Sequence, residues 1–192
     1  FVPLAGPANR QGRIAADNLA GIPSRYTGTQ GSAVLRCFDL TVATTGINET
    51  AAKRAGIPYE RSYSFPFSNA TYYPGAAQLA VKLLFNKENG KVLGAQFIGQ
   101  KGADKRCDVM ATAIRCGLTV DDLVDLELCY APPFNSAKDP VNLCGMIAQN
   151  ILHGRVKVFH WDEIPAPGGD VILLDVRTKG EYERGSIPGF IN

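Results

Sequence analysis

The chain has 192 residues, of which 45% are hydrophobic and 20% are charged, and these are ordinary proportions for a globular protein. Its formal net charge of +2 is too small to indicate a nucleic-acid or acidic-membrane partner, and no apolar run is long enough to span a bilayer. The chain starts at Phe1 without a basic-then-apolar leader, so we expect a fragment of a larger cytoplasmic protein.

Residues 1–21 predict a loop that runs into a helix. Pro7 suits the first helical turn, and Gly21 suits the position just past the helix end. A polar connection rich in glycine follows at residues 22–32.

Residues 33–45 predict one strand, because apolar side chains recur at even spacing, as one face of a sheet requires. These side chains are Val34, Phe38, Leu40 and Val42. Asn48 can then cap a short helix that ends at Gly56. Residues 59–67 are rich in aromatic side chains and again predict an extended segment.

The clearest local signal lies at residues 78–99. Two apolar runs, AQLAVKLLF and KVLGAQFIG, flank Asn89-Gly90, the dipeptide most typical of a hairpin turn. We therefore expect an antiparallel hairpin there. Residues 103–116 then predict a helix that is closed by Gly117.

Two more helices are predicted by their first residues. Thr119 and Asp122 have the spacing of a capping box. Asp139 can cap a final helix with Pro140 in its first turn, and this helix should end before Gly154. Its apolar stripe, with residues three and four apart, consists of Cys144, Ile147, Ala148, Ile151 and Leu152.

Strands followed by helices, with one obvious hairpin, predict an α+β domain built on an antiparallel sheet at residues 30–157. After it, WDEIPAPGGD is a turn-rich linker, and VILLDV at residues 171–176 predicts a buried parallel strand of an α/β segment. Too few residues follow this strand to bury a core, so we expect the chain after about residue 166 to be disordered or held by neighbouring molecules.

The cysteines are scattered and form no CxxC pair. They are Cys37, Cys107, Cys116, Cys129 and Cys144. Such a set is too sparse for a disulfide scaffold. Cys107 and Cys116 share a predicted helix but fall on opposite faces, because each residue turns the helix by about 100°. We therefore expect reduced, mostly buried thiols and no metal site.

Two segments have a composition that is unusual for plain packing, NATYYPGA at residues 69–76 and LCYAPPFNSAKDPVN at residues 128–142. Each places tyrosine near proline, which stiffens a loop, and a stiff loop carrying a phenol suits a site where a hydroxyl donates to a forming anion. The alternative is that these tyrosines simply pack on the domain surface. The chain contains no GxGxxG, P-loop or HExxH motif, so any chemistry must be shared with other sequence.

Four runs, in this order, carry a resemblance: LAGPANRQGRIAADNLAG, YYPGAAQLAVKLLF, GKVLGAQFIGQKGADKRCDVMATAI and LELCYAPPFNSAKDPVNLCGMIAQN. They resemble the pyridine nucleotide–disulfide oxidoreductase family, in its branch of coenzyme A-disulfide reductases and NADH oxidases. The tail VILLDVRTKGEYERGSIPGFIN resembles the start of a rhodanese domain. The resemblance implies the end of an FAD-binding domain at residues 1–29, a dimerisation domain at residues 30–157, and a linker with a truncated rhodanese-like segment at residues 158–192.

The resemblance further implies a homodimer that uses FAD and NAD(P)H to reduce coenzyme A disulfide, or a coenzyme A persulfide or polysulfide. The backbone positions that match the flavin contact are Leu4, Ala5 and Gly6, at a helix N-terminus that favours the negative charge of reduced flavin. Asn9 and Lys138 match positions that contact coenzyme A, where an ammonium group suits phosphate.

Tyr72 and Tyr130 match a catalytic pair that reaches the partner subunit's active site, and Tyr130 also matches a flavin contact. The implied role is to hydrogen-bond, and protonate, the coenzyme A thiolate, since a phenol with a pKa of about 10 suits a thiolate with a pKa of about 8.5. Tyr73 is the rival of Tyr72, and adjacent strand residues point to opposite faces, so one of the two should serve.

The chain also departs from the family pattern. Asn69 stands in place of a histidine, Phe134 in place of a tyrosine that some relatives carry, and Ser186 in place of the usual histidine of the rhodanese turn. Two alternatives therefore stay open: an NADH oxidase of the same fold that reduces oxygen, or an assembly module without catalytic residues. The redox cysteine and the nicotinamide site are implied before Phe1, and the persulfide-forming cysteine after Asn192. We expect the fragment alone to bind no cofactor tightly and to be inactive.

Overall fold

The computed structural model describes residues 2–164 and 171–192. The chain forms two compact units, Phe1–Val156 and Lys157–Asn192, and each is described by itself. No helix in the described residues is both long enough and apolar enough to cross a membrane.

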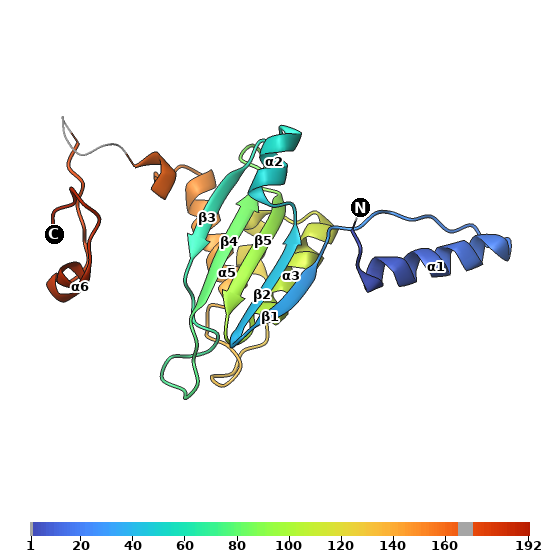
Figure 1. The fold of residues 1–192 in the computed structure, drawn as a ribbon, viewed down its shortest axis with the longest axis horizontal. Coiled ribbons are helices and arrows are strands. Elements are labelled where there is room, and N and C mark those ends of the chain that lie inside the picture. The colour runs from blue at the N-terminus through green and yellow to red at the C-terminus, as the bar shows by residue number, and fades with distance from the viewer. Residues whose placement is uncertain (1, 165–170) are drawn as a thin grey trace. The chain divides into compact units, whose positions relative to one another are not determined.

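The first unit is built on a five-stranded sheet with the strand order β1-β2-β5-β4-β3, and all neighbouring strands are antiparallel (Figure 1). In chain order the strands are β1 (Ala33–Cys37), β2 (Leu40–Gly46), β3 (Glu60–Ser64), β4 (Leu79–Phe85) and β5 (Val92–Gly99). The predicted α+β fold with an antiparallel sheet is confirmed.

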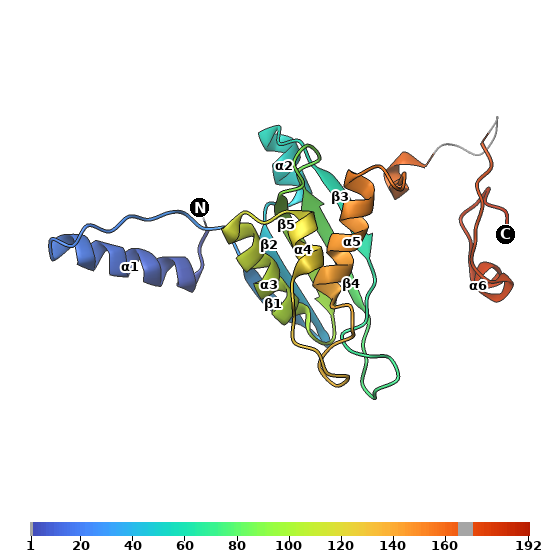
Figure 2. The ribbon, with the colours of Figure 1, turned by 180° about the vertical axis from the view of Figure 1, so that it is seen from behind.

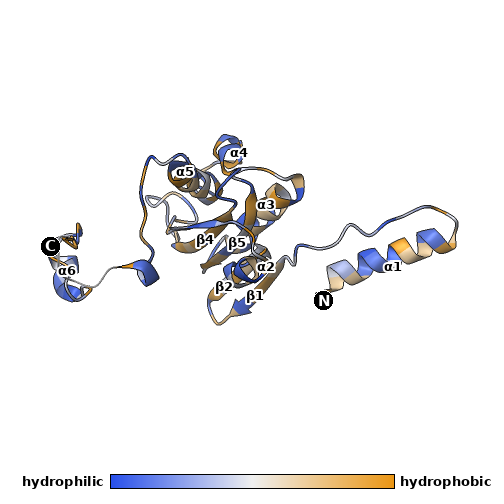
Figure 3. Cartoon of the chain, turned by 90° about the horizontal axis from the view of Figure 1, so that it is seen from above, coloured by the Kyte–Doolittle hydropathy of each residue, from blue (hydrophilic) through white to orange (hydrophobic). Residues whose placement is uncertain are grey.

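Three helices cover one face of this sheet, as Figure 2 shows from behind and Figure 3 from above. They are α3 (Ala103–Cys116), α4 (Val120–Asp125) and α5 (Pro140–Leu152). The core lies between the sheet and these helices, and its largest apolar members are Leu79, Leu83, Phe85, Phe97, Met110, Val120, Leu123 and Val141. A fourth helix, α2 (Glu49–Ala55), connects β2 to β3 at one end of the sheet.

The helix termini lie where the caps predicted them. The side chains of Asn48, Thr119 and Asp139 accept hydrogen bonds from the first turns of α2, α4 and α5. Gly56 and Gly117 end α2 and α3 in the left-handed conformation. Helix α1 (Ala5–Leu19) also forms as predicted, and none of its residues is buried.

The prediction of one strand at residues 33–45 is wrong. This segment is a hairpin, in which Cys37 pairs with Leu40 and the chain reverses at Phe38 and Asp39. Phe38 has a φ of 54° and is 93% exposed, so it is not part of a buried face. Left-handed phenylalanine is rare, and no glycine in the turn signalled the reversal.

The predicted hairpin at residues 78–99 is confirmed as β4 and β5, but its connection is longer than a two-residue turn. Phe85 pairs with Val92, so the connection runs through residues 86–91. The side chain of Asn86 accepts hydrogen bonds from two backbone amides of this connection, those of Glu88 and Asn89, at 2.9 and 3.1 Å.

The thiols are less buried than predicted. Cys107 and Cys144 are buried, and burial raises the pKa of Cys107 to about 11 and that of Cys144 to about 12. Cys37, Cys116 and Cys129 are exposed. Cys107 and Cys116 both lie in α3, the first buried and the second exposed, in agreement with their predicted placement on opposite faces.

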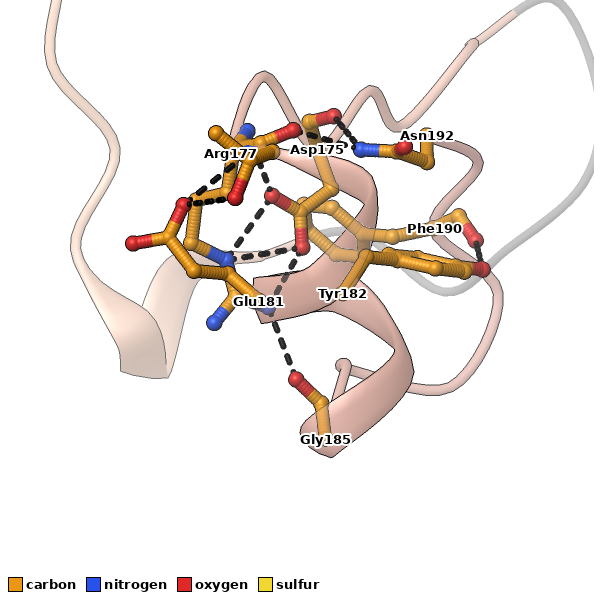
Figure 4. Close-up of polar contacts among 8 residues, drawn as sticks. Asp175, Arg177, Glu181, Tyr182, Gly185, Phe190 and Asn192 are labelled. Carbon is orange, nitrogen blue, oxygen red and sulfur yellow. Dashed lines mark hydrogen bonds and ion pairs between the residues drawn. The ribbon is translucent and has the colours of Figure 1, made fainter.

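The second unit contains a short 3-10 helix, Trp161–Glu163, and helix α6 (Lys179–Arg184). Residues 171–176 are not a buried strand: Leu174 makes a single parallel bridge with Ile191, and none of residues 171–192 is buried. Side-chain contacts, including that of Tyr182 Oη with the Phe190 carbonyl at 2.8 Å, hold this segment in a defined conformation (Figure 4). The linker residues 165–170 lie outside the described residues, and the expectation of disorder, or of support from neighbouring molecules, stays a prediction.

Candidate functional site

Two loops emerge at the end of the sheet opposite to α2, as Figures 1 and 2 both show. Residues 65–78 connect β3 to β4, and residues 126–139 connect α4 to α5. We call them the tyrosine loops, because they carry Tyr72 and Tyr130.

The tyrosine loops bring the two predicted catalytic hydroxyls together. Tyr72 Oη and Tyr130 Oη lie 3.3 Å apart, although the residues are far apart in sequence. The side chains remain accessible, since Tyr72 is 76% and Tyr130 50% exposed. This hydrogen bond to Tyr130 raises the pKa of Tyr72 above its ordinary value.

Tyr73 takes a different place in the same loop. Its backbone amide donates to the Ala70 carbonyl at 3.0 Å, which closes the turn that presents Tyr72. Of the two rival tyrosines, Tyr72 is therefore the one whose hydroxyl contacts Tyr130 in this structure.

A set of buried polar residues beneath the tyrosine loops was not found by sequence reasoning. Arg106 of α3 is only 2% exposed and donates to the Ser68 carbonyl at 2.8 Å and to Asn135 Oδ1 at 3.0 Å. It also forms an ion pair with Asp139, the N-cap of α5, at 3.2 Å. The one available signal was a charged residue on the helix face that also carries Ala103 and Met110.

Asn69, where the family pattern has histidine, belongs to this buried set and is fully buried. Its Oδ1 accepts hydrogen bonds from Ser68 Oγ at 3.0 Å and from Lys101 Nζ at 3.2 Å. Lys101 also reaches the Pro133 carbonyl at 3.5 Å, so it links the two tyrosine loops near the surface. Asn69 thus supports the loop rather than presenting a side chain to solvent.

The other predicted residues of the second tyrosine loop are exposed. Phe134 is 71% exposed, and Lys138 is exposed directly before the N-cap of α5. Lys138 also accepts a hydrogen bond at its carbonyl from Ser136 Oγ, at 2.5 Å, which orders the backbone there.

Three of the predicted flavin-contacting residues, Leu4, Ala5 and Gly6, lie at the start of α1, whereas Tyr130 lies in the second tyrosine loop. Leu4 is the N-cap without a side-chain hydrogen bond, and the first turn, which includes Ala5 and Gly6, carries no acidic side chain. This open helix N-terminus fits a group with partial negative charge. Asn9 Nδ2 donates to the Ala5 carbonyl at 3.0 Å, so its amide is engaged within its own helix. No hydrogen bond of α1 in the described residues reaches the tyrosine loops.

This arrangement can stabilise an anion. Two exposed phenols that share one hydrogen bond can both turn toward an incoming negative group, and the buried network beneath them keeps their backbones in place. Within the described residues, no group of three or more histidine, cysteine or acidic side chains is placed to hold a metal ion.

Comparison with known proteins agrees with this architecture. The family model for the pyridine nucleotide-disulphide oxidoreductase dimerisation domain matches residues 33–140. Coenzyme A disulfide reductase of Staphylococcus epidermidis is 38% identical over 149 residues, which cover 77% of this chain and 34% of that protein. NADH oxidase of Methanocaldococcus jannaschii is 34% identical over 153 residues, which cover 80% of this chain and 34% of that protein. The chain thus spans about a third of the length of these curated relatives.

Two solved structures are also similar. The crystal structure of reduced CoADR-RHD from Bacillus anthracis matches with a TM-score of 0.94 and 51% identity, over 100% of this chain and 35% of that chain. A NAD-dependent persulfide reductase from A. fulgidus matches with a TM-score of 0.83 and 36% identity, over 94% of this chain and 33% of that chain.

Proposed function

This chain belongs to the pyridine nucleotide-disulphide oxidoreductase family through its dimerisation domain, and from that premise we propose that it is part of a flavin-dependent NAD(P)H:disulfide reductase. The proposed substrate is coenzyme A disulfide, or a coenzyme A persulfide or polysulfide. The names of the similar proteins, a coenzyme A disulfide reductase and a persulfide reductase, support this substrate class. The observation that carries the proposal is the contact between Tyr72 and Tyr130 at 3.3 Å.

We propose a symmetric homodimer formed through the domain at residues 30–157, with the tyrosine loops of each subunit reaching the active site of its partner. The match to a dimerisation domain supports this assembly. The high exposure of both tyrosines, 76% and 50%, leaves them accessible to a group supplied from outside the domain.

The proposed role of the tyrosine pair is to receive the thiolate that leaves when the disulfide is split. Two electrons, which bound FAD would supply, split the S–S bond into two sulfur anions, and coenzyme A departs as one of these thiolates. Tyr130 and Tyr72 donate hydrogen bonds to this sulfur, and one phenol passes its proton to give the thiol. The tyrosinate formed then regains a proton from water.

The cofactors of this proposal are FAD and NAD(P)H, and bound FAD would pass electrons from the nicotinamide to the disulfide. The amides of Ala5 and Gly6 would hold the anionic edge of the flavin, because that helix N-terminus has no side-chain cap. The amide of Leu4 would do so only after releasing the Val2 carbonyl, to which it donates at 2.9 Å. Lys138 would contact a phosphate of coenzyme A. Asn9 would do so only after releasing the Ala5 carbonyl.

The test compares Tyr72→Phe, Tyr130→Phe and the double variant in the full-length protein, with Tyr73→Phe as the matched control. A charge-assisted hydrogen bond contributes about 1.5–3 kcal/mol, so each single change should lower disulfide turnover by about tenfold to a hundredfold. Flavin reduction by the nicotinamide should change little. The double variant should lose less than the product of the singles, since both phenols serve one charge.

Two outcomes would favour other functions. Near-normal turnover in both variants, together with a lower melting temperature or weaker dimer, would support an assembly module whose tyrosines pack. A second candidate acceptor is oxygen, which the similarity to an NADH oxidase favours. Oxygen consumption that exceeds disulfide reduction at equal NADH concentration would assign the chain to that function.

For the tail, we propose that residues 158–192 hold a linker and the start of a rhodanese-like domain. The match to the Bacillus anthracis structure over 100% of this chain includes these residues and supports the assignment. Ser186 is exposed in the turn where histidine is usual.

A further inference from the structure

We propose that Arg106 is a positioning residue that holds the two tyrosine loops in register, so that Tyr72 and Tyr130 can act on the same anion. The inference rests on the function proposed for the tyrosine pair. Arg106 contacts neither hydroxyl, and it would act through the backbones that carry them.

The guanidinium of Arg106 reaches both tyrosine loops at once. It donates to the Ser68 carbonyl in the first loop at 2.8 Å and to Asn135 Oδ1 in the second loop at 3.0 Å. Its Nε donates to Asp139 Oδ2, at the base of the second loop, at 3.3 Å. One planar group therefore contacts both tyrosine loops, at Ser68 in the first and at Asn135 and Asp139 in the second.

Asn135 carries this constraint from Arg106 to both tyrosines. Its Nδ2 donates to the carbonyl of Cys129, the residue just before Tyr130, at 3.1 Å. Its own carbonyl accepts from the amide of Ala70 in the first loop, at 3.0 Å. Ala70 in turn accepts from the amide of Tyr73, which closes the turn around Tyr72.

Arg106 and Asp139 form a buried ion pair, each with a side chain 2% exposed, and such a pair fits a role in holding loop geometry better than a role in adding stability. A buried ion pair contributes little net stability, because desolvation offsets the attraction, but removing one partner is costly. A lysine at this position would keep the charge, but it could not donate in three fixed directions. Lys101 makes a weaker and exposed link between the same loops.

The experiment uses Arg106→Lys and Arg106→Gln in the full-length protein, with Lys105→Gln as a control. Lys105 is the exposed neighbour on the same helix and loses the same charge. Both Arg106 variants should lower disulfide turnover by about tenfold or more, with flavin reduction within about twofold of wild type. If Arg106→Gln fails to fold, Arg106→Lys decides, because it keeps a cation beside Asp139.

Two further readouts separate positioning from a purely structural role. In the Tyr72→Phe, Tyr130→Phe background, Arg106→Lys should reduce turnover by no more than about twofold, since the groups that it positions are gone. In the otherwise wild-type protein, fluorotyrosine placed at position 72 should titrate at lower pH after Arg106→Lys. The reason is that the hydrogen bond to Tyr130, which raises the pKa of Tyr72, would be lost.

The outcomes are distinguishable from those of the proposed function. If the tyrosine variants keep normal turnover, the function fails, and the titration at position 72 still tests the positioning. An unchanged titration in Arg106→Lys would overturn the inference. An equal turnover loss with and without the two hydroxyls would also overturn it, as would a loss that disappears after correction for the folded fraction.

Discussion

Arg106 in the first unit and Arg177 in the second make the same kinds of contact in opposite surroundings. Each pairs with an aspartate, and each donates to a backbone carbonyl at 2.8 Å. The side chains of Arg106 and Asp139 are both 2% exposed, whereas Arg177 is 46% exposed and Asp175 9%. The first pair is buried in the domain, whereas none of residues 171–192 around the second pair is buried.

The two arginines differ in how far apart in the chain the residues that they join lie, and in whether water reaches their contacts. Arg106 joins residues that lie far apart in the chain, and its partners have no access to water. Arg177 joins Asp175 to Gly185 within one short segment, and Asn192 closes it by donating to the Asp175 carbonyl at 2.9 Å (Figure 4). Because the Arg177 side chain is half exposed, water competes for its contacts, so they order the backbone locally without adding much stability.

The largest expected effect follows from removing one partner of the buried pair. Asp139→Ala leaves Arg106 buried without its counter-charge and removes the cap of α5, so the free energy of unfolding should fall by about 3–5 kcal/mol. Urea unfolding measures this loss. Asp175→Ala in the tail should leave the same transition unchanged. Equal losses of unfolding free energy in Asp139→Ala and Asp175→Ala would show that burial does not make the Arg106 ion pair more important to stability than the Arg177 ion pair.

A smaller effect should come from adding one methyl group in each region. A Cβ at Gly94 would lie 2.0 Å from the backbone oxygen of Ile47, so Gly94→Ala should cost about 1–3 kcal/mol of unfolding free energy. A Cβ at Gly180 in α6 meets nothing within 4 Å, so Gly180→Ala should stabilise that helix by about 0.5–1 kcal/mol. Urea midpoints and helix circular dichroism test the pair. Destabilisation by Gly180→Ala would mean that the tail packs more tightly than its exposure indicates.

A last effect, within the range of the two glycine substitutions, is a pH dependence that we expect from the first unit. Burial alone would raise the pKa of Glu49, but hydrogen bonds from Lys82, Lys53 and Tyr59 outweigh burial and lower this pKa to about 2. A pKa depressed by folding contributes stability that is present above the unfolded value and is lost as the pH falls toward 2. We expect the free energy of unfolding to fall by about 1–2 kcal/mol between pH 5 and pH 2, and Glu49→Gln should flatten this pH profile.

Glu181 in the second unit is the control. Thr178 lowers the pKa of Glu181, but that carboxylate is exposed, so Glu181→Gln should leave the pH profile unchanged. A profile that stays steep in Glu49→Gln would contradict the assignment.

Much of the fold followed from short stretches of sequence. Helix caps such as Asn48, Thr119 and Asp139 were predicted correctly, because a cap is satisfied by amides within the next turn. The β4–β5 hairpin followed from its two apolar runs. The choice of Tyr72 and Tyr130 came from the resemblance of their loops to a family, since tyrosine and proline alone do not distinguish a site from packing.

Tertiary structure decided what those stretches could not. The apolar alternation ran through Phe38 and hid a turn, because the pattern records hydrophobicity and not chain reversal. The apolar run at residues 171–176 predicted a buried strand, yet it stays exposed because burial requires a packing partner, which an apolar run does not itself provide. The burial of Arg106 beneath two distant loops, and the contact between the tyrosine hydroxyls that they carry, depend on residues that meet only after the sheet and helices have packed. Local propensity acts over a few residues, whereas these contacts join segments far apart in the chain.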